Sequence, residues 1–194
     1  MSQVKISGNA SGTGVLTIAA PNTNTDRSIT LPDKAGAIAV GAGTIVQVVQ
    51  GTTSTSVAVS TTTYTDTTLS ASITPSSSSN KILVMVNQTA NAGRSARPIG
   101  AGIQLLRDST IILKSAQDTT GPFDQYVNVS SSTATNIITR YTINFLDSPA
   151  TTSSVTYKTQ GRPYTTANSG AVTFNQNAAT NNATSTILLM EVVA

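Results

Sequence analysis

Short runs in which apolar and polar residues alternate recur from Thr44 to the end of the chain, and turn-forming residues separate them. The run 136–146 is the clearest example, because Tyr141, Ile143 and Phe145 fall on one side of an extended strand while polar residues fall on the other. No stretch has the 3.6-residue period of an amphipathic helix. This pattern restricts the chain to an all-β fold.

The predicted strands are rich in Val, Ile and Thr, which suit a pleated and half-buried surface. Ten or so short strands separated by turns predict an antiparallel β-sandwich or jelly roll over residues 44–194. We expect run 81–87 to be a central strand and run 185–193 to be central in a sheet or buried between subunits, since both are strongly apolar and an apolar edge strand would invite aggregation. The predicted strands span residues 44–50, 56–60, 64–74, 81–87, 99–107, 111–114, 123–129, 136–146, 153–160, 171–175 and 185–193.

Composition narrows the choice of partner. Charged residues make up only 10% of the chain and the net charge is +3, so Ser, Thr and Asn must cover the exposed strand faces. The 11 basic residues are scattered along the sequence, whereas a nucleic-acid surface needs them clustered. No apolar run approaches the length of a membrane span, and the first residues lack the apolar core of a secretory signal. We therefore expect no nucleic-acid partner, no membrane insertion and synthesis in a cytoplasm.

The residue types needed for most catalytic sites are missing. The chain has no His and no Cys, which excludes a Ser-His-Asp triad, a cysteine nucleophile and a typical zinc site. Most of the eight carboxylates lie next to turn residues, where Asp commonly bonds the local backbone. Asp118 and Asp124 flank one loop and could offer oxygen ligands to calcium, but their spacing fits loop capping better. The sequence predicts a protein that is not an enzyme and has no cofactor or metal.

Residues 1–43 form a separate segment with three short predicted strands, 15–18, 27–31 and 37–40. This segment carries too little apolar bulk for its own core, and a small ribbon is marginal in water. We therefore interpret it as an N-terminal arm that needs a partner surface. The residues expected to contact that surface are Val15, Leu16, Ile18, Ile29, Leu31 and Ile38.

Aromatic and basic residues supply the remaining candidates, because Tyr and Arg are enriched at interface hot spots. Arg94 and Arg97, in a predicted loop 91–98, and Tyr164, in a predicted loop after Gly161, are candidates for contact with a saccharide or a protein, with simple solvation as the alternative. The candidates for the core or for an interface between subunits are Tyr141, Ile143, Phe145, Tyr157, Leu188 and Met190.

Several segments resemble bacteriophage virion-surface proteins of the fibre and decoration type. The stretch Gly8–Asp33 resembles a leader of such proteins, with its Gly-rich start, an apolar-Thr strand, Ala-Pro, a polar turn and a strand that ends in Leu-Pro-Asp. Ile73–Val84, Leu146–Lys158 and Ser185–Glu191 resemble parts of a knob domain that is similar to the trimeric jelly rolls of the complement and tumour-necrosis-factor type. Together these segments touch most of the chain.

The resemblance implies a homotrimer on the virion surface, with residues 1–43 as an anchoring arm and residues 44–194 as a jelly-roll knob. Its implied partners are the major capsid protein or other virion proteins. Two roles follow: a capsid decoration (cement) protein or short head fibre, or a tail fibre that contacts a host-surface glycan or protein. The absence of heptads, Gly-x-y tracts and shaft repeats favours the decoration role.

Overall fold

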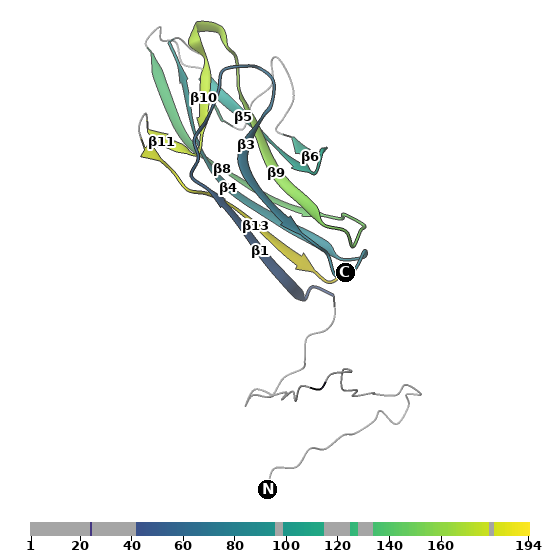
Figure 1. Ribbon diagram of the computed structural model, residues 1–194. Coiled ribbons are helices and arrows are strands. Elements are labelled where there is room, and N and C mark those ends of the chain that lie inside the picture. The colour runs from purple at the N-terminus through teal and green to yellow at the C-terminus, as the bar shows by residue number, and fades with distance from the viewer. Residues whose placement is uncertain (1–23, 25–41, 96–98, 115–124, 128–133, 179–180) are drawn as a thin grey trace. The chain divides into compact units, whose positions relative to one another are not determined.

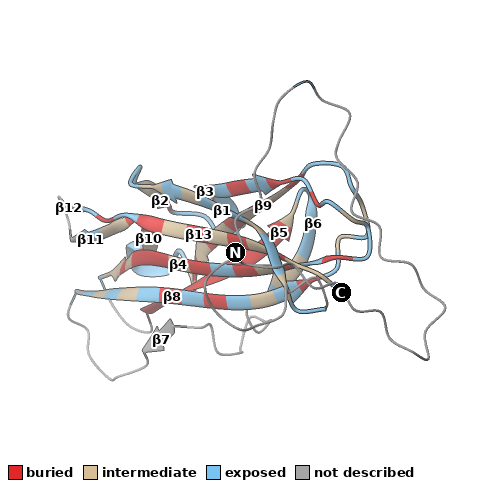
Figure 2. Cartoon of the chain, turned by 90° about the horizontal axis from the view of Figure 1, so that it is seen from below, coloured by how far each residue is buried: buried red, intermediate tan, exposed pale blue. Residues whose placement is uncertain are grey.

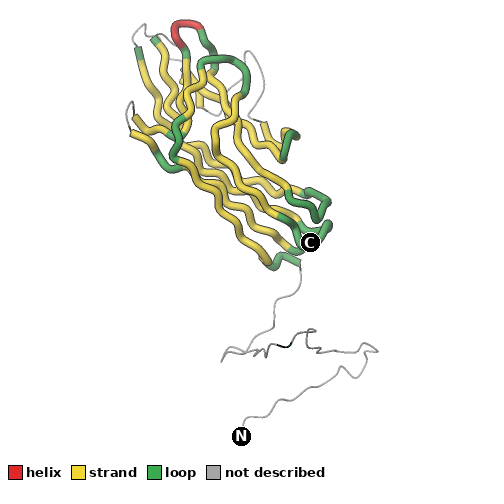
Figure 3. Tube along the Cα trace, in the orientation of Figure 1, coloured by secondary structure: helices red, strands yellow, loops and turns green. Residues whose placement is uncertain are grey.

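A computed structural model describes residues 24, 42–95, 99–114, 125–127, 134–178 and 181–194. The chain divides into two compact units, residues 1–38 and 39–194, and nearly all described residues belong to the second. In this second unit two antiparallel sheets face one another, and a short helical turn, η1 (Ala167–Ser169), is the single helical element among the described residues (Figures 1 and 3). The predicted all-β sandwich is confirmed.

The first sheet, called sheet 1, is organised around one long strand, β4. On one side, β8 pairs with β4 along its whole length. On the other side, β13 and β10 each pair with part of β4, and they pair in turn with β1 and β2, respectively. The predicted central positions of the runs 81–87 and 185–193 are therefore confirmed. The strands of sheet 1 are β1 (Ile45–Thr53), β2 (Val57–Val59), β4 (Lys81–Arg94), β8 (Thr135–Asp147), β10 (Ala171–Phe174) and β13 (Ser185–Val192).

The second sheet, called sheet 2, has the strand order β3-β9-β5-β6, and β7 pairs with β5 beside β6. Asp108 has a positive φ of 53° and closes the hairpin between β5 and β6, as a tight turn requires. A small separate hairpin, β11 (Gln176–Ala178) with β12 (Asn181–Asn182), follows β10. The strands of sheet 2 are β3 (Thr65–Ile73), β5 (Ile99–Arg107), β6 (Thr110–Lys114), β7 (Gln125–Val127) and β9 (Val155–Pro163).

The core lies between the two sheets and follows the period-two alternation of the strands. Buried residues alternate with exposed ones along β3 and with half-buried ones along β9 and β13, which Figure 2 shows as changes of colour along the strands. Burying one large apolar side chain stabilises the fold by about 1.5–3 kcal/mol. Side chains that are almost completely buried include Leu69, Ile73, Ile82, Val84, Ile103, Leu105, Tyr157, Phe174, Ile187 and Leu189.

A polar network without charges lies inside this apolar core. Gln88 on β4 donates a hydrogen bond of 2.9 Å to Asn175 Oδ1, and its Oε1 accepts one of 2.8 Å from the Thr159 hydroxyl on β9. The hydroxyls of Thr159 and Thr67, on β3, lie 2.6 Å apart. Buried polar groups are tolerated only when they are hydrogen-bonded, so this network links the two sheets in one register.

The predicted loop 91–98 and the predicted loop after Gly161 are partly wrong, because strands extend into both. β4 continues to Arg94 because β8 pairs with it over its full length, so Asn91–Arg94 belong to a strand. β9 continues through Gly161 to Pro163, paired with β5. The ring of Phe174 occupies the space that a side chain at position 161 would need, so glycine lets the strand pass close to the core. The hairpin of β11 and β12 was not predicted, because its Asn- and Ala-rich sequence has no strand pattern.

Candidate functional site

Four apolar residues form a row across the outer face of sheet 1. Val48 on β1 pairs with Met190 on β13, Met190 pairs with Leu83 on β4, and Leu83 pairs with Leu146 on β8. All four point away from the core, because the intervening residues of their strands face it. Val48 is 56% exposed and Leu146 is 50% exposed. We call these four residues the apolar row.

The residues next to the apolar row extend the same character. The row on one side consists of Gln50, Leu188, Met85 and Asn144, and none of them is charged; the row on the other side holds Ile45, Val192 and one exposed charged residue, Lys81. Val46, at the irregular start of β1, is exposed as well. Monomeric soluble proteins rarely expose a contiguous apolar surface of this kind, and such surfaces mark interaction sites.

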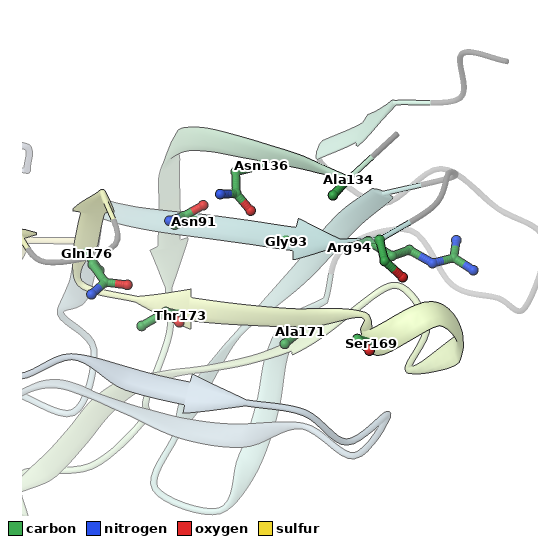
Figure 4. A pocket seen from close by; sticks show the side chains of 10 residues that line it. Asn91, Gly93, Arg94, Ala134, Asn136, Ser169, Ala171, Thr173 and Gln176 are labelled. Carbon is green, nitrogen blue, oxygen red and sulfur yellow. The ribbon is translucent and has the colours of Figure 1, made fainter. Parts of the chain in front are cut away.

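The opposite end of the same face carries a polar groove with a volume of about 450 Å³. Thr173 pairs with Asn91, and Gly93 lies between Ala171 and Asn136 in the register of β10, β4 and β8. Figure 4 shows Asn91 and Asn136 side by side on this surface, with the turn η1 closing one end. The full lining is Asn91, Gly93, Arg94, Ser95, Ala134, Asn136, Ser169, Ala171, Thr173 and Gln176.

The structure brings two of the three predicted surface residues together. Arg94 and Tyr164 both line a narrow crevice beside the groove, with Ile99 and Pro163. Arg94 is half-buried and its Nε donates a hydrogen bond of 2.8 Å to the Ala167 carbonyl, so simple solvation does not describe it. Tyr164 is also half-buried. Arg97 lies outside the described residues.

The residues predicted for the core or an interface divide into two groups. Tyr141, Ile143 and Tyr157 are buried between the sheets, and Phe145 packs against them. The Tyr141 hydroxyl donates a hydrogen bond of 2.7 Å to the Ala101 carbonyl. Leu188 and Met190 are half-buried on the outer face of sheet 1. Met190 belongs to the apolar row and Leu188 lies beside it. The predicted anchoring residues of the arm, Val15, Leu16, Ile18, Ile29, Leu31 and Ile38, lie outside the described residues, as do Asp118 and Asp124.

The carboxylates that the structure describes bond to distant strands or turns, so their interpretation as local turn groups is wrong. Each lies where two segments far apart in sequence meet, and sequence spacing alone could not reveal this. Asp66 accepts hydrogen bonds from Lys158 and Gln160, Asp108 from the Thr156 backbone, Asp147 from Arg107 and Tyr157, and Glu191 from Ser76 and Asn80.

The surroundings shift the pKa of Glu191 and of Tyr157, the hydrogen-bond partner of Asp147. Burial alone would raise the pKa of Glu191, but hydrogen bonds from Ser76 and Asn80 outweigh it and hold this pKa below its ordinary value. Burial raises the pKa of Tyr157, and so does its 2.7 Å hydrogen bond to Asp147, whose charge adds to the effect. Asp147 is also paired with Arg107 at 2.7 Å. Both carboxylates thus hold the sandwich together.

Neither surface of sheet 1 was identified from the sequence. The apolar row joins residues from four strands that are far apart in the chain, and only the strand register aligns them. Within the described part of the chain, no three metal-ligating His, Cys, Asp or Glu side chains lie together. No helix in that part is long and apolar enough to cross a membrane.

Comparison with protein-family models and with curated proteins gave no match for this chain. The fold and the two surfaces of sheet 1 are therefore the basis for a functional proposal.

Proposed function

We propose that this chain is a structural subunit of a phage particle, and that it associates with its own copies into a homotrimer through the apolar row of sheet 1. The observation that carries the proposal is the alignment of four apolar side chains, Val48, Met190, Leu83 and Leu146, on the outer face of sheet 1, with Val48 and Leu146 exposed. Association of such faces removes apolar surface from water, at about 25 cal/mol per Å².

The strand order supports a jelly-roll knob. Among the described strands, eight have five or more residues: β1, β3, β4, β5, β6, β8, β9 and β13. In chain order, sheet 1 holds the first, eighth, third and sixth of them, and sheet 2 holds the second, seventh, fourth and fifth. An eight-stranded jelly roll built from two Greek keys has this strand order, and the order therefore supports the proposed knob.

A particle-surface role also agrees with how this sandwich is held together. The polar network of Gln88, Thr159 and Thr67 contains no charged group, and the exposed residues of β3 are all Thr or Ser apart from Asp66. Salt screens interactions between exposed charges strongly, but it has little effect on apolar burial and on neutral hydrogen bonds. A protein built in this way keeps its cohesion when the ionic strength outside a cell changes.

Within this role, we propose capsid decoration, with residues 1–43 as the anchoring arm that contacts the major capsid protein or a neighbouring virion protein. The resemblance of residues 8–33 to a virion leader and the lack of shaft repeats support this choice. The alternative is a tail fibre that binds the host surface. The polar groove on sheet 1 favours that alternative, because decoration does not require a ligand site.

The first experiment is to measure the mass of the purified full chain by light scattering with size-exclusion chromatography. We expect a trimer. Val48→Asp should reduce the mass to that of a monomer, because it places a charge within the apolar row. Ile111→Asp is the matched control, since Ile111 is an exposed isoleucine on β6 of sheet 2, and it should leave the trimer intact. A wild-type monomer, or a trimer that survives Val48→Asp, contradicts the proposed interface.

A second experiment separates the two particle roles. Gold-labelled antibody against the chain should mark the whole capsid shell if it decorates the capsid, whereas label at one vertex or on the tail supports the fibre role. Deletion of residues 1–43 should yield a folded protein that no longer attaches to particles. Unchanged attachment would remove the anchoring function from the arm.

A further inference from the structure

We propose that the polar groove of sheet 1 binds a neutral saccharide. This inference deepens the proposed particle-surface role and rests on it for its biological setting, because a host-surface glycan is the ligand that such a protein would meet. The groove lies on the same face of β4 as the apolar row but at the other end of the strand. Asn91 and Leu83 are eight residues apart, which corresponds to about 26 Å along an extended chain.

The chemistry of the lining selects a ligand with many hydroxyl groups. The side chains of Asn91 and Asn136 each offer a donor and an acceptor, and Thr173, Ser169 and Ser95 add hydroxyls. Apolar side chains in the described lining are no larger than the methyl groups of Ala134 and Ala171, so an apolar ligand would gain little. The volume of about 450 Å³ lies within the range of small-ligand sites.

The lining offers little selectivity for an anion. Arg94 is the single charged residue in the described lining, and its Nε is already engaged by the Ala167 carbonyl. Ile138 pairs with Asn91 across β4 and β8 and is 54% exposed beside the groove. A sugar ring has hydroxyls on its rim and C–H groups on its faces, so amides together with one exposed apolar side chain match it.

One atom in the groove lacks a hydrogen bond that it needs. Asn91 Oδ1 is buried and has no hydrogen-bond partner among the described residues. A buried acceptor without a donor is costly, and native structures usually satisfy such atoms with water or a ligand. A ligand hydroxyl that donates to Asn91 Oδ1 would satisfy it.

The wall of the groove is held in place before any ligand arrives. The Ser95 hydroxyl donates a hydrogen bond of 2.7 Å to the Asn168 carbonyl, and Arg94 bonds the preceding residue of the same turn. These bonds hold Asn168 and Ser169 at φ values of 52° and 56°, in the left-handed region. Strained backbone of this kind persists only where its surroundings enforce it, and it is common at ligand sites. A rigid wall lowers the entropy lost on binding.

Because Gly93 has no Cβ atom, it leaves room for the Asn136 amide. A Cβ atom at residue 93 would lie 2.7 Å from Asn136 Oδ1, so Gly93→Ala must displace this side chain. Because the Asn136 side chain is exposed and can rotate away, the pairing of β4 with β8 should stay intact. This substitution therefore tests the groove without removing any polar group.

The test uses the full chain and five soluble probes: neutral hexasaccharides of glucose, mannose, galactose and N-acetylglucosamine, and hexagalacturonate as a charged comparison. Binding is measured by isothermal titration calorimetry at millimolar ligand. We expect at least one neutral probe to bind, and Asn91→Ala and Gly93→Ala each to weaken that binding about tenfold. Asn144→Ala is the matched control, because Asn144 is exposed on the same face of β8 but outside the groove; it should bind as the wild type does.

Absence of binding by every neutral probe, tighter binding of hexagalacturonate, or equal binding by all variants overturns the inference. Circular dichroism of each variant separates a lost site from a lost fold. Val48→Asp separates this inference from the proposed trimer: it should change the measured mass while binding per chain to a soluble hexasaccharide stays the same. A trimer that binds no saccharide would refute the groove alone.

Discussion

The amide nitrogen of Gln88 lies 2.9 Å from Asn175 Oδ1 in the interior of the sandwich, where Gln88 has an exposed fraction of 0%. Asn175 follows the end of β10, and its own amide nitrogen donates to the carbonyls of Thr55 and Thr67 at 2.8 Å each. Two buried amides thus connect β4 with β3 and with the loop before β2. The arrangement explains how a protein with few charges and few aromatic residues can have one defined packing.

Replacing Gln88 by leucine, which has a similar size, should lower the stability of the fold. Gln88→Leu leaves Asn175 Oδ1 without its donor, so we expect the free energy of unfolding to fall by about 1–3 kcal/mol. Thr142→Val changes an exposed threonine of β8 that lies outside the apolar row and the row next to it, and it should stay within about 0.5 kcal/mol of the wild type. Denaturant unfolding at one fixed protein concentration measures both. Equal stability of the two variants would show that the network contributes nothing.

Glu191 should make the fold sensitive to acid. Its folded-state pKa lies below the ordinary value of 4.5, so near that pH the unfolded chain binds the proton more readily. This contribution to stability is fully present above pH 4.5 and is lost as the pH falls through the folded-state pKa. We expect Glu191→Gln to lower the free energy of unfolding by about 1–2 kcal/mol at neutral pH and to reduce the loss of stability between pH 7 and pH 3. Thermal melts from pH 3 to pH 7 test this. The same fall in melting temperature with acid in the variant and the wild type would contradict it.

Gly161 should not tolerate a side chain. A methyl group at this position would overlap the ring of Phe174, which is completely buried, so Gly161→Ala should destabilise the fold by about 1–3 kcal/mol. The double variant Gly161→Ala with Phe174→Leu should lose less stability than the sum of the two single variants, because the smaller side chain leaves room for the methyl group. Strict additivity in a double-mutant cycle would show that the two residues do not compete for this space.

The facing of β8 has a direct test in neighbouring residues. Ile143 is buried opposite Val86, while Asn144 points outward. Ile143→Asp buries an unpaired charge, at a cost of about 3–5 kcal/mol, and should abolish cooperative unfolding. Thr142→Asp adds the same group at another outward-pointing position of β8, farther from the apolar row, and should leave a normal transition. Far-UV circular dichroism with thermal melting measures both, and a stable Ile143→Asp variant would show that the strand faces the other way.

Local patterns were sufficient to predict most of the strands and which of their side chains are buried. The alternation around Tyr141, Ile143 and Phe145 predicted which side of β8 is buried, and the apolar character of the closing run predicted that β13 is central. Such predictions succeed because a strand's side chains alternate with a period of two whatever its neighbours are. The extension of β4 to Arg94 was missed, since Ala, Asn and Gly carry little strand signal of their own and the pairing with β8 decides their conformation.

Contacts between distant segments depended on the tertiary fold. Val48, Leu83, Leu146 and Met190 are ordinary apolar residues in four separate runs, and they become one row only through the register of β1, β13, β4 and β8. The same holds for the groove around Asn91 and Asn136, and for Glu191, which reaches back to the turn at Ser76. A local pattern records which way each side chain points along its own strand, but it does not record which strand lies beside it. The pairing of strands settles that, and with it the two surfaces from which we infer function.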